Sequence, residues 1–284
     1  MRREVWSRVA GFGSRRTRRA AEGSTLATRT SILGVAAALL ALAAPLAAQD
    51  FAWNGTVPAG QSIEIKGING DIHAVAASAG QVRVTAVKDA ADDDPEEVRI
   101  EVVEHAGGVT ICAVYPTPRG RRANECRPGS GGRNSSHDND VEVDFRVEVP
   151  NGVLLVARTV NGDVEAASIA ADVDARTVNG DVRVSTDGIA RAGTVNGSLD
   201  VAMGRSDWSD DLEFRTVNGG ITLRIAGELN ADVSASTVNG DIETEFPLTV
   251  QGRWGPRRMR GTVGTGGREL SLSTVNGSIA LERR

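Results

Sequence analysis

The side chains best suited to ligand chemistry form a short basic and aromatic cluster near the C-terminus. The whole chain carries a formal net charge of −5, so a local run of guanidinium groups beside an indole stands out. Such a cluster is typical of contact with an acidic glycan or lipopolysaccharide, through bidentate pairing and cation–π contact. The alternative is a variant coil whose Trp covers the end of the fold while the Arg side chains are solvated. The predicted ligand-binding residues are Arg253, Trp254, Arg257, Arg258 and Arg260.

Residues suited to catalysis are sparse. The histidines His73, His105 and His137 are scattered and have no Ser or Cys motif beside them. Secreted β-helix enzymes that act on polysaccharides use clustered Asp with Arg or Lys, whereas this chain has only two lysines, Lys66 and Lys88. Because no acid–base pair is positioned, the sequence predicts a protein that is not an enzyme and that uses no cofactor. A carbohydrate-active enzyme of β-helix type is the alternative.

An acidic cluster lies between two expected strands. Such a run can bind calcium, but a solvated loop is its usual meaning, and we predict no metal site. The cluster comprises Asp89, Asp92, Asp93, Asp94, Glu96 and Glu97.

The two cysteines, Cys112 and Cys126, predict one disulfide if the chain is exported to an oxidising compartment. Closing a loop of about 15 residues stabilises the fold by about 3 kcal/mol in the chain-entropy model. The enclosed segment 116–122 is rich in Pro and Gly and is not expected to order itself. The Gly-, Ser- and Asn-rich segment 128–140 is expected to be mobile.

The elements that must position all of these residues are set by a repeat. The tetrapeptide Thr-Val-Asn-Gly occurs six times, and a degenerate copy, Gly67-Ile68-Asn69-Gly70, lies upstream. The steps between successive Asn residues are 18, 17, 22, 21 and 37, so the last step has room for two coils. A period near 20 residues is the length of one coil of a stacked repeat. The asparagines of the six copies are Asn161, Asn179, Asn196, Asn218, Asn239 and Asn276.

Strand alternation assigns each repeat position to a face. One register places Thr and Asn on the inner face of every copy and Val on the outer face. Stacked inner Thr and Asn then form a structural ladder in which each side chain bonds its neighbour, since a buried polar group needs a partner. The ladder comprises the six asparagines with Thr177, Thr194, Thr216 and Thr237. An outward apolar row is usually covered, here by the N-terminal region, and the alternative is an interaction ridge for a ligand or partner. The outward valines are Val160, Val178, Val195, Val217, Val238 and Val275.

We therefore predict an all-β, single-stranded β-helix-like solenoid with coils of 17–22 residues. An antiparallel meander of hairpins is the alternative, because Asn-Gly is also a strong hairpin signal. The solenoid is favoured because a meander gives no reason for the repeated inward Thr. The expected organisation is a signal peptide over 1–48, an N-terminal β region with the disulfide loop over 50–150, and the repeat solenoid over 151–284.

The N-terminal segment predicts export. An arginine-rich start leads into the uncharged apolar run 32–46, followed by Ala47 and Ala48, which is the order of a secretory signal peptide. An uncleaved membrane anchor is the alternative interpretation. Removing residues 1–48 removes eight Arg and two Glu, so the formal net charge moves from −5 to −11. We expect a periplasmic or surface location, no nucleic-acid partner and no stable membrane span after cleavage.

The repeated T-V-N-G-D-[VI] pattern, with Ile111–Pro116, Glu125–Gly129 and the stretch that begins at Phe246, resembles the bacterial putative-adhesin family of exported β-repeat proteins. The resemblance covers nearly all of residues 50–284. It implies an exported, non-enzymatic β-solenoid. Together with the basic cluster and the outward valines, this predicts an adhesin, envelope scaffold or binding protein whose partner is a surface glycan or an envelope protein. An envelope-stress accessory protein that binds a membrane partner is a further alternative.

Overall fold

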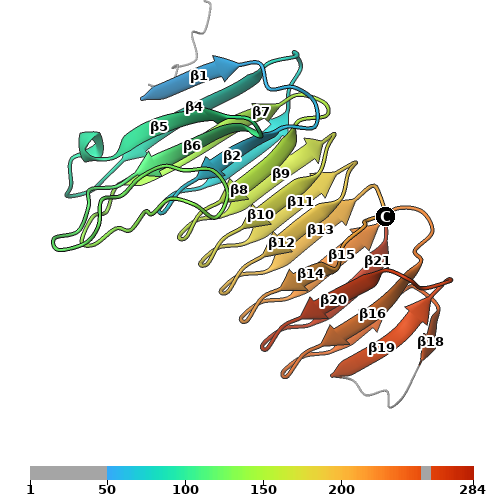
Figure 1. The fold of residues 1–284 in the computed structure, drawn as a ribbon. Helices are drawn as coiled ribbons and strands as arrows, with labels where there is room; N and C mark the ends of the chain where they lie inside the picture. Colours follow the sequence, from blue (N-terminus) through green and yellow to red (C-terminus); the bar gives the residue numbers. More distant parts are fainter. Residues whose placement is uncertain (1–49, 251–256) are drawn as a thin grey trace, which may run out of the picture. The chain divides into compact units, whose positions relative to one another are not determined.

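The computed structural model describes residues 50–250 and 257–284, which belong to one compact unit, Ala47–Arg284. The segment expected to be a signal peptide, 1–48, lies outside the described residues. Two β-sheets face each other across a core of Val, Ile, Leu and Ala side chains (Figure 1). Within the described part of the chain, no helix has the length and apolar character needed to cross a membrane.

Hydrogen bonds join neighbouring strands within each sheet, and the spatial order differs from the order along the chain. The first sheet consists, from edge to edge, of β1 (Phe51–Gly55), β4 (Val82–Asp89), β7 (Glu142–Val149), β3 (Ile72–Ala76), β9 (Val164–Ile169), β11 (Val182–Thr186), β13 (Leu199–Met203), β15 (Ile221–Ile225), β21 (Ile279–Arg283) and β17 (Ile242–Thr244). The second sheet consists, from edge to edge, of β18 (Leu248–Val250), β19 (Arg258–Val263), β16 (Ala231–Ser236), β20 (Glu269–Ser273), β14 (Leu212–Arg215), β12 (Ala190–Gly193), β10 (Val173–Arg176), β8 (Leu154–Arg158), β2 (Ser62–Lys66), β6 (Gly108–Val114) and β5 (Arg99–His105).

A coil of the repeat contributes one strand to each sheet. In the coil around Asn179, β10 in the second sheet leads through the Thr-Val-Asn-Gly corner into β11 in the first sheet. The next coil pairs with it in parallel through both strands, β12 with β10 and β13 with β11. The predicted all-β solenoid is confirmed. The hairpin meander is wrong, because consecutive repeats pair in parallel rather than antiparallel.

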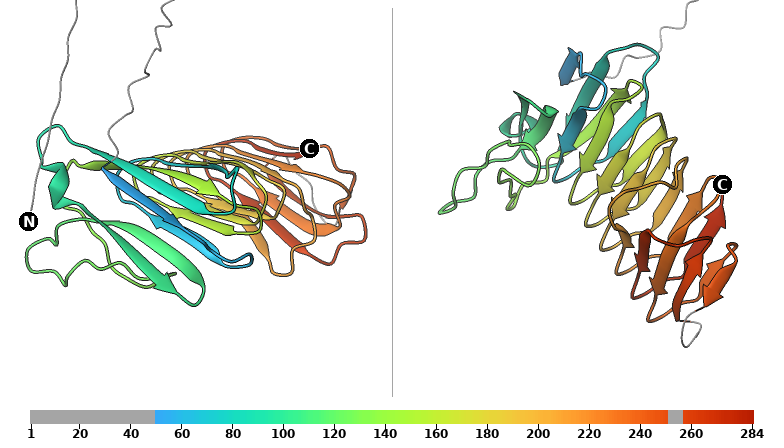
Figure 2. Two further views of the ribbon diagram at one scale, coloured as in Figure 1. Left: turned by 90° about the horizontal axis from the view of Figure 1, so that it is seen from above. Right: turned by 45° about the vertical axis from the view of Figure 1, so that its right-hand side comes forward.

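The stacking order departs from the sequence order at both ends. The C-terminal coil, β20 and β21, lies between the β14–β15 coil and the β16–β17 coil (Figures 1 and 2). At the other end, the β2–β3 coil lies between β8–β9 and β6–β7. Antiparallel strands occur near both ends: β1, β4 and β5 at one end, and β18 and β19 at the other. The edge strand β17 of the first sheet remains parallel.

The 37-residue step was expected to have room for two coils, and this is wrong. Asn239 and Asn276 form a direct parallel bridge, so no coil separates their corners. The residues between them include the antiparallel strands β18 and β19 instead.

The corner threonines lie inside, as the register predicts. Each is at most 6% exposed, and its hydroxyl donates to carbonyls of the neighbouring corner, as Thr177 does to Val160 (3.3 Å) and Gly162 (2.9 Å). The glycine at the end of each corner has a φ of 145–157°, in the region open mainly to glycine. Its close approach to the adjacent coil leaves no room for a Cβ: one added at Gly197 would lie 1.9 Å from the Gly180 carbonyl oxygen.

The inward placement of the asparagines is wrong: the asparagine of each of the six Thr-Val-Asn-Gly copies is exposed. The chain turns directly after Thr, so strand alternation does not continue through Val and Asn. The turn is visible in the hydrogen bonds, since Val178 and Asn179 both donate their backbone N–H to the Val160 carbonyl. The amides still stack: from Asn161 onward each donates its Nδ2–H to the Oδ1 of the preceding asparagine in the stack, at 2.7–2.8 Å. The asparagine ladder therefore lies on the outside of the corners, beside the valines.

Candidate functional site

A hydrogen-bonded loop, which we call the cap loop (residues 115–141), follows β6 and carries a surface hollow. Its first part is linked to β6 by the Cys112–Cys126 disulfide. Buried Asn124 links both arms of the loop, donating to the carbonyls of Tyr115 (3.0 Å) and Ser135 (2.8 Å). Tyr115 donates its hydroxyl to the Val141 carbonyl at 2.7 Å. Segments 116–122 and 128–140 thus obtain backbone partners from an asparagine side chain, since Asn124 donates to the carbonyls of both Pro116 and Ser135.

The hollow between the two arms of the cap loop, which we call the cap hollow, has a volume of about 1200 Å³. Among the described residues that line it, four are arginines and none is acidic. On an acidic chain this places a concentrated positive field over a concave surface, which favours anionic ligands. The four are Arg119, Arg121, Arg122 and Arg133.

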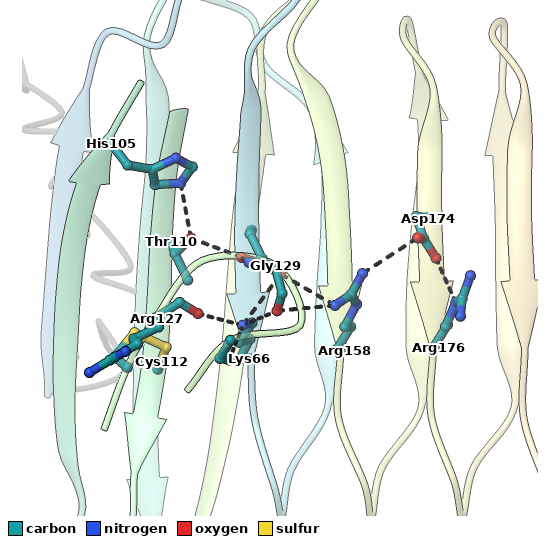
Figure 3. A network of polar contacts seen from close by, with 12 residues as sticks. Lys66, His105, Thr110, Cys112, Arg127, Gly129, Arg158, Asp174 and Arg176 are labelled. Atoms are coloured by element: carbon teal, nitrogen blue, oxygen red, sulfur yellow. Dashed lines mark hydrogen bonds and ion pairs between the residues drawn. A yellow bond between two sulfur atoms is a disulfide. The ribbon is translucent and has the colours of Figure 1, made fainter. Parts of the chain in front are cut away.

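Beside this hollow, the cap loop is fastened to the outer face of the second sheet by a lysine (Figure 3). The Lys66 ammonium, on β2, donates to the carbonyls of Arg127 (2.6 Å) and Gly129 (2.5 Å). Glu64, 4% exposed on the same strand, accepts from the Thr110 hydroxyl and the Gly129 backbone N–H, each at 2.9 Å. This arrangement fixes the loop over the sheet edge next to the corners.

Charge across this network is balanced between neighbouring strands. Arg158 on β8 lies 3.5 Å from Glu64 and 3.6 Å from Asp174, which in turn pairs with Arg176 at 2.9 Å (Figure 3). Burial lowers the pKa of the Lys66 ammonium; the nearby Glu64 carboxylate opposes that shift and the Arg158 guanidinium adds to it. A cavity of about 290 Å³ lies here, between the loop and the sheet. With its cations engaged by carbonyls and carboxylates, this network anchors the loop.

The basic cluster predicted near the C-terminus is only partly within the described structure. Arg253 and Trp254 lie outside the described residues. Arg258 and Arg260 alternate with buried Met259 along β19, so both point outward, and Arg257 is exposed just before the strand. Arg258 and Arg260 therefore share the outer face of the second sheet at the opposite end from the cap loop, and Arg257 is exposed just before them in the sequence.

The residue after each corner glycine supplies a partner for the next coil. The Asp163 carboxylate accepts from the backbone N–H of Asp181 at 2.8 Å, and the Asp181 carboxylate accepts from Ser198 at 2.9 Å. Where Ser replaces Asp, its hydroxyl takes over the acceptor role, as Ser198 does for Gly220 at 3.2 Å. This explains why Asp and Ser interchange at this position.

The valines of the corners line up along the solenoid. Val160, Val178, Val195 and Val275 are 37–39% exposed and Val238 is 55% exposed, while Val217 is partly buried. Consecutive valines are joined by backbone hydrogen bonds of 3.1–3.2 Å, in the order Val160, Val178, Val195, Val217, Val275, Val238. We call these six residues the valine ridge.

The histidines occupy separate places. His73 lies on the outer face of the first sheet beside Glu165, 3.3 Å away, and His137 lines the cap hollow. His105 contacts the Thr110 hydroxyl at 3.2 Å, but Thr110 is fully buried and its hydroxyl donates to Glu64. Among residues 50–250 and 257–284, no group of three or more His, Cys, Asp or Glu side chains is placed to hold a metal ion.

Sequence reasoning missed the residues that shape the cap hollow. Arg119, Arg121 and Arg122 fall in a segment whose composition predicts disorder, and no pattern marks Asn124. A partial signal for a basic site exists, since these three arginines lie between Cys112 and Cys126, which predict a disulfide-closed loop. Arg133, which completes the hollow, could not be connected to them without the bonds that Asn124 makes to Ser135.

Comparisons with known proteins place this geometry in a family. A family model described as Toastrack DUF4097 matches residues 56–282. Among solved structures, a putative cell adhesion protein from Clostridium sporogenes is 11% identical, with a TM-score of 0.41, covering 82% of this chain and 99% of its own. A putative adhesin from Bacteroides fragilis is 11% identical, with a TM-score of 0.37, covering 82% and 96%. A search of curated proteins finds no match.

Proposed function

The chain belongs to the Toastrack DUF4097 family, and from that premise we propose that it is an exported, non-enzymatic, adhesin-like binding protein for acidic glycans of the cell envelope. The observation that carries the proposal is the cap hollow, in which four arginines and no acidic residue line a concave surface of the described structure. Arginine suits this role because its planar guanidinium pairs with carboxylate and phosphate groups through two parallel hydrogen bonds.

Two further observations support export without enzymatic activity. The Cys112–Cys126 disulfide is of a kind that persists in oxidising compartments, as expected for the periplasm or the cell surface. In the described residues, the contact between His105 and Thr110 involves a hydroxyl that substrate cannot reach, and Glu64 bonds that hydroxyl rather than the imidazole. A nucleophile needs both access and an oriented base, so this contact is structural.

The outward arginines at the other end form a second candidate contact for the same class of ligand. Arg257, Arg258 and Arg260 face solvent beside β16, whereas the hollow lies near the opposite end of the solenoid. An acidic polymer long enough to reach both would gain affinity by bivalent attachment. The cap hollow remains the primary site because it is concave.

Binding of the purified full chain to a glycan array and to lipopolysaccharide tests the proposal. Replacing Arg119, Arg121 and Arg122 by Ala is expected to weaken binding about tenfold or more. The matched control replaces Arg83, Arg99 and Arg205, which are also exposed and change the net charge equally.

A third variant with Arg257, Arg258 and Arg260 replaced by Ala reports on the C-terminal surface. Equal loss in the control would show a response to net charge alone and contradict the site. The absence of binding to any acidic glycan or to lipopolysaccharide would refute the proposed function.

A further inference from the structure

The valine ridge is an apolar strip with one residue from each of six consecutive coils. Parallel strands are about 4.8 Å apart, so the five steps from Val160 to Val238 span about 24 Å. The equivalent residue of the degenerate copy, Ile68, is only 8% exposed, and the neighbouring Asn69 amide is bonded to the cap loop at the Asn139 and Val141 carbonyls. The chain thus covers this row where its own cap loop reaches it and leaves five of the six valines exposed, with Val217 partly buried.

Charges of opposite sign flank the ridge. The residue before the corner is basic in three of the six copies that carry the ridge, Arg158, Arg176 and Arg215, although Asp174 pairs with the first two. The residue after the corner glycine is acidic in three of these copies, Asp163, Asp181 and Asp241, although Arg183 pairs with the first two. The basic row belongs to the second-sheet side and the acidic row to the first-sheet side of the same strip.

From this pattern we infer that a second copy of the chain docks on the valine ridge, with the two-fold axis of the dimer parallel to the axis along which the coils stack. A second copy presents the same coil spacing, so apolar contacts repeat at every coil without loss of register. The inference stands on the ridge and its flanks, and it is independent of glycan binding at the cap hollow.

The charges select this orientation over the alternative. With the two-fold axis parallel to the stacking axis and close to the valines, the basic row of each copy lies over the asparagine and aspartate side of the other. With the axis perpendicular to the stack, the copies run antiparallel and the basic rows face each other. Like charges juxtaposed across an interface are costly, so the parallel arrangement is favoured.

The size of the strip sets the strength of the contact. A strip about 24 Å long that includes both charged rows buries on the order of 1,000 Å² in total, at the lower limit for a specific interface. The dimer is therefore weak and concentration-dependent in solution, and it becomes effective where copies are concentrated on a surface.

Sedimentation of the full chain, produced with export so that its disulfide forms, measures the self-association. Replacing Val195 with Asp is expected to weaken it about tenfold or more, because a carboxylate would be desolvated in the strip. The matched control is Val87→Asp, on β4, since Val87 is 40% exposed but lies away from the ridge. Thermal melts of both variants verify that they remain folded.

Disulfide crosslinking tests the orientation. Val160→Cys and Val238→Cys, at opposite ends of the ridge, should each give a covalent dimer on their own. An antiparallel dimer would crosslink only when the two variants are mixed, and this would overturn the proposed axis. A chain that stays monomeric up to about 1 mM, or that is weakened equally by Val87→Asp, would overturn the inference itself.

Discussion

At the scale of single residues, the corner Thr and Asn stand two positions apart but meet different environments. The Thr194 hydroxyl is buried and donates to the carbonyls of Val178 (3.3 Å) and Gly180 (3.0 Å). The Asn196 amide is exposed, so water can replace the bond that it donates to Asn179. A hydrogen bond that water can replace contributes less to stability than one that protects a buried group.

Replacing Thr194 with Val should therefore lower the free energy of unfolding by about 1–3 kcal/mol, because the shape is kept and only the donor is lost. Asn196→Ala should lower it by about 0.5–1 kcal/mol. Thr222→Val, on the outer face of β15, serves as the control and should change stability by no more than about 0.5 kcal/mol. Urea denaturation gives all three values, and a larger loss for the Asn variant than for Thr194→Val would contradict this ranking.

The corner glycines offer a second test at this scale. Gly197→Ala should be among the most damaging single substitutions, at about 3 kcal/mol or more, since its Cβ would meet the Gly180 carbonyl and its φ is 153°. Gly80→Ala is the control, because no atom lies within 4 Å of its added Cβ. That variant should be neutral or slightly stabilising, by up to about 1 kcal/mol. Similar melting temperatures for the two variants would show that the corner can relax.

The sequence predicted the corner residues well and the direction of their side chains only in part. Thr177 continues the alternation of β10, so its inward position followed from the period of two. Asn179 comes after the turn, where the period no longer applies, and its outward position could not be read from alternation. The exchange of Asp181 for Ser198 in the next copy becomes intelligible only from the backbone N–H that each of them accepts.

At the scale of elements, the acidic loop after β4 is held by a carboxylate from the cap loop. Asp140 accepts the backbone N–H groups of Ala91, Asp92 and Asp93 at 2.9–3.0 Å. The hydrogen bonds from Asp92 and Asp93, and then that from Ala91, lower the pKa of Asp140 below its ordinary value of 3.8. The two loops are therefore coupled through the ionised form of one side chain.

This coupling predicts a local response to acid. A depressed folded pKa means that the ionised carboxylate contributes stability above pH 3.8, and that the contribution is lost as the pH falls through the folded value. The amide protection factors of Ala91, Asp92 and Asp93 should decrease in that range while those of β13 are retained. Asp140→Asn should show reduced protection already at neutral pH. Protection that is independent of pH, or unaffected by this substitution, would exclude the coupling.

The strands that precede the cap loop were predictable, whereas the cap loop was not. The segments of β5 and β6 carry Val and Ile in strand-like runs, and they form strands within the predicted N-terminal β region 50–150. The loop between β6 and β7 lacks such a run, and its order depends on Asn124 and Tyr115, whose partners are far away in the sequence. A composition rich in Pro, Gly and Ser describes the backbone but not the side chains that bind it.

At the scale of the whole unit, the C-terminal coil has neighbours on both sides. Chain ends commonly fray, but β21 pairs with β15 and with β17. Hydrogen exchange should therefore find the amides of β21 about as protected as those of β13. The amides of β17, which is an edge strand of the first sheet although it is internal in sequence, should exchange faster. Rapid exchange at β21 would contradict the inserted position of the last coil.

The presence of coils was predictable from the repeat, and their order was not. Every copy offers the same Thr, Asn and Gly groups to a neighbour, so the corners of Asn218 and Asn276 fit together as well as those of Asn196 and Asn218. Because the interfaces between coils are nearly identical, they do not specify which coil pairs with which. The tetrapeptide therefore does not specify which coil comes next, nor that the segment between Asn239 and Asn276 contains the antiparallel pair β18–β19.

The interleaved ends also determine how this protein can change in length. A new repeat appended at either terminus would find no free corner in sequence order, because the last coil already lies inside the stack. Between β8 and β15, by contrast, sequence order and spatial order agree. Duplication of a middle unit such as 177–193 would lengthen the solenoid by one coil and leave both ends intact. We therefore expect natural or engineered relatives to differ in solenoid length through the number of middle coils, while the interleaved segments at the two ends stay unchanged.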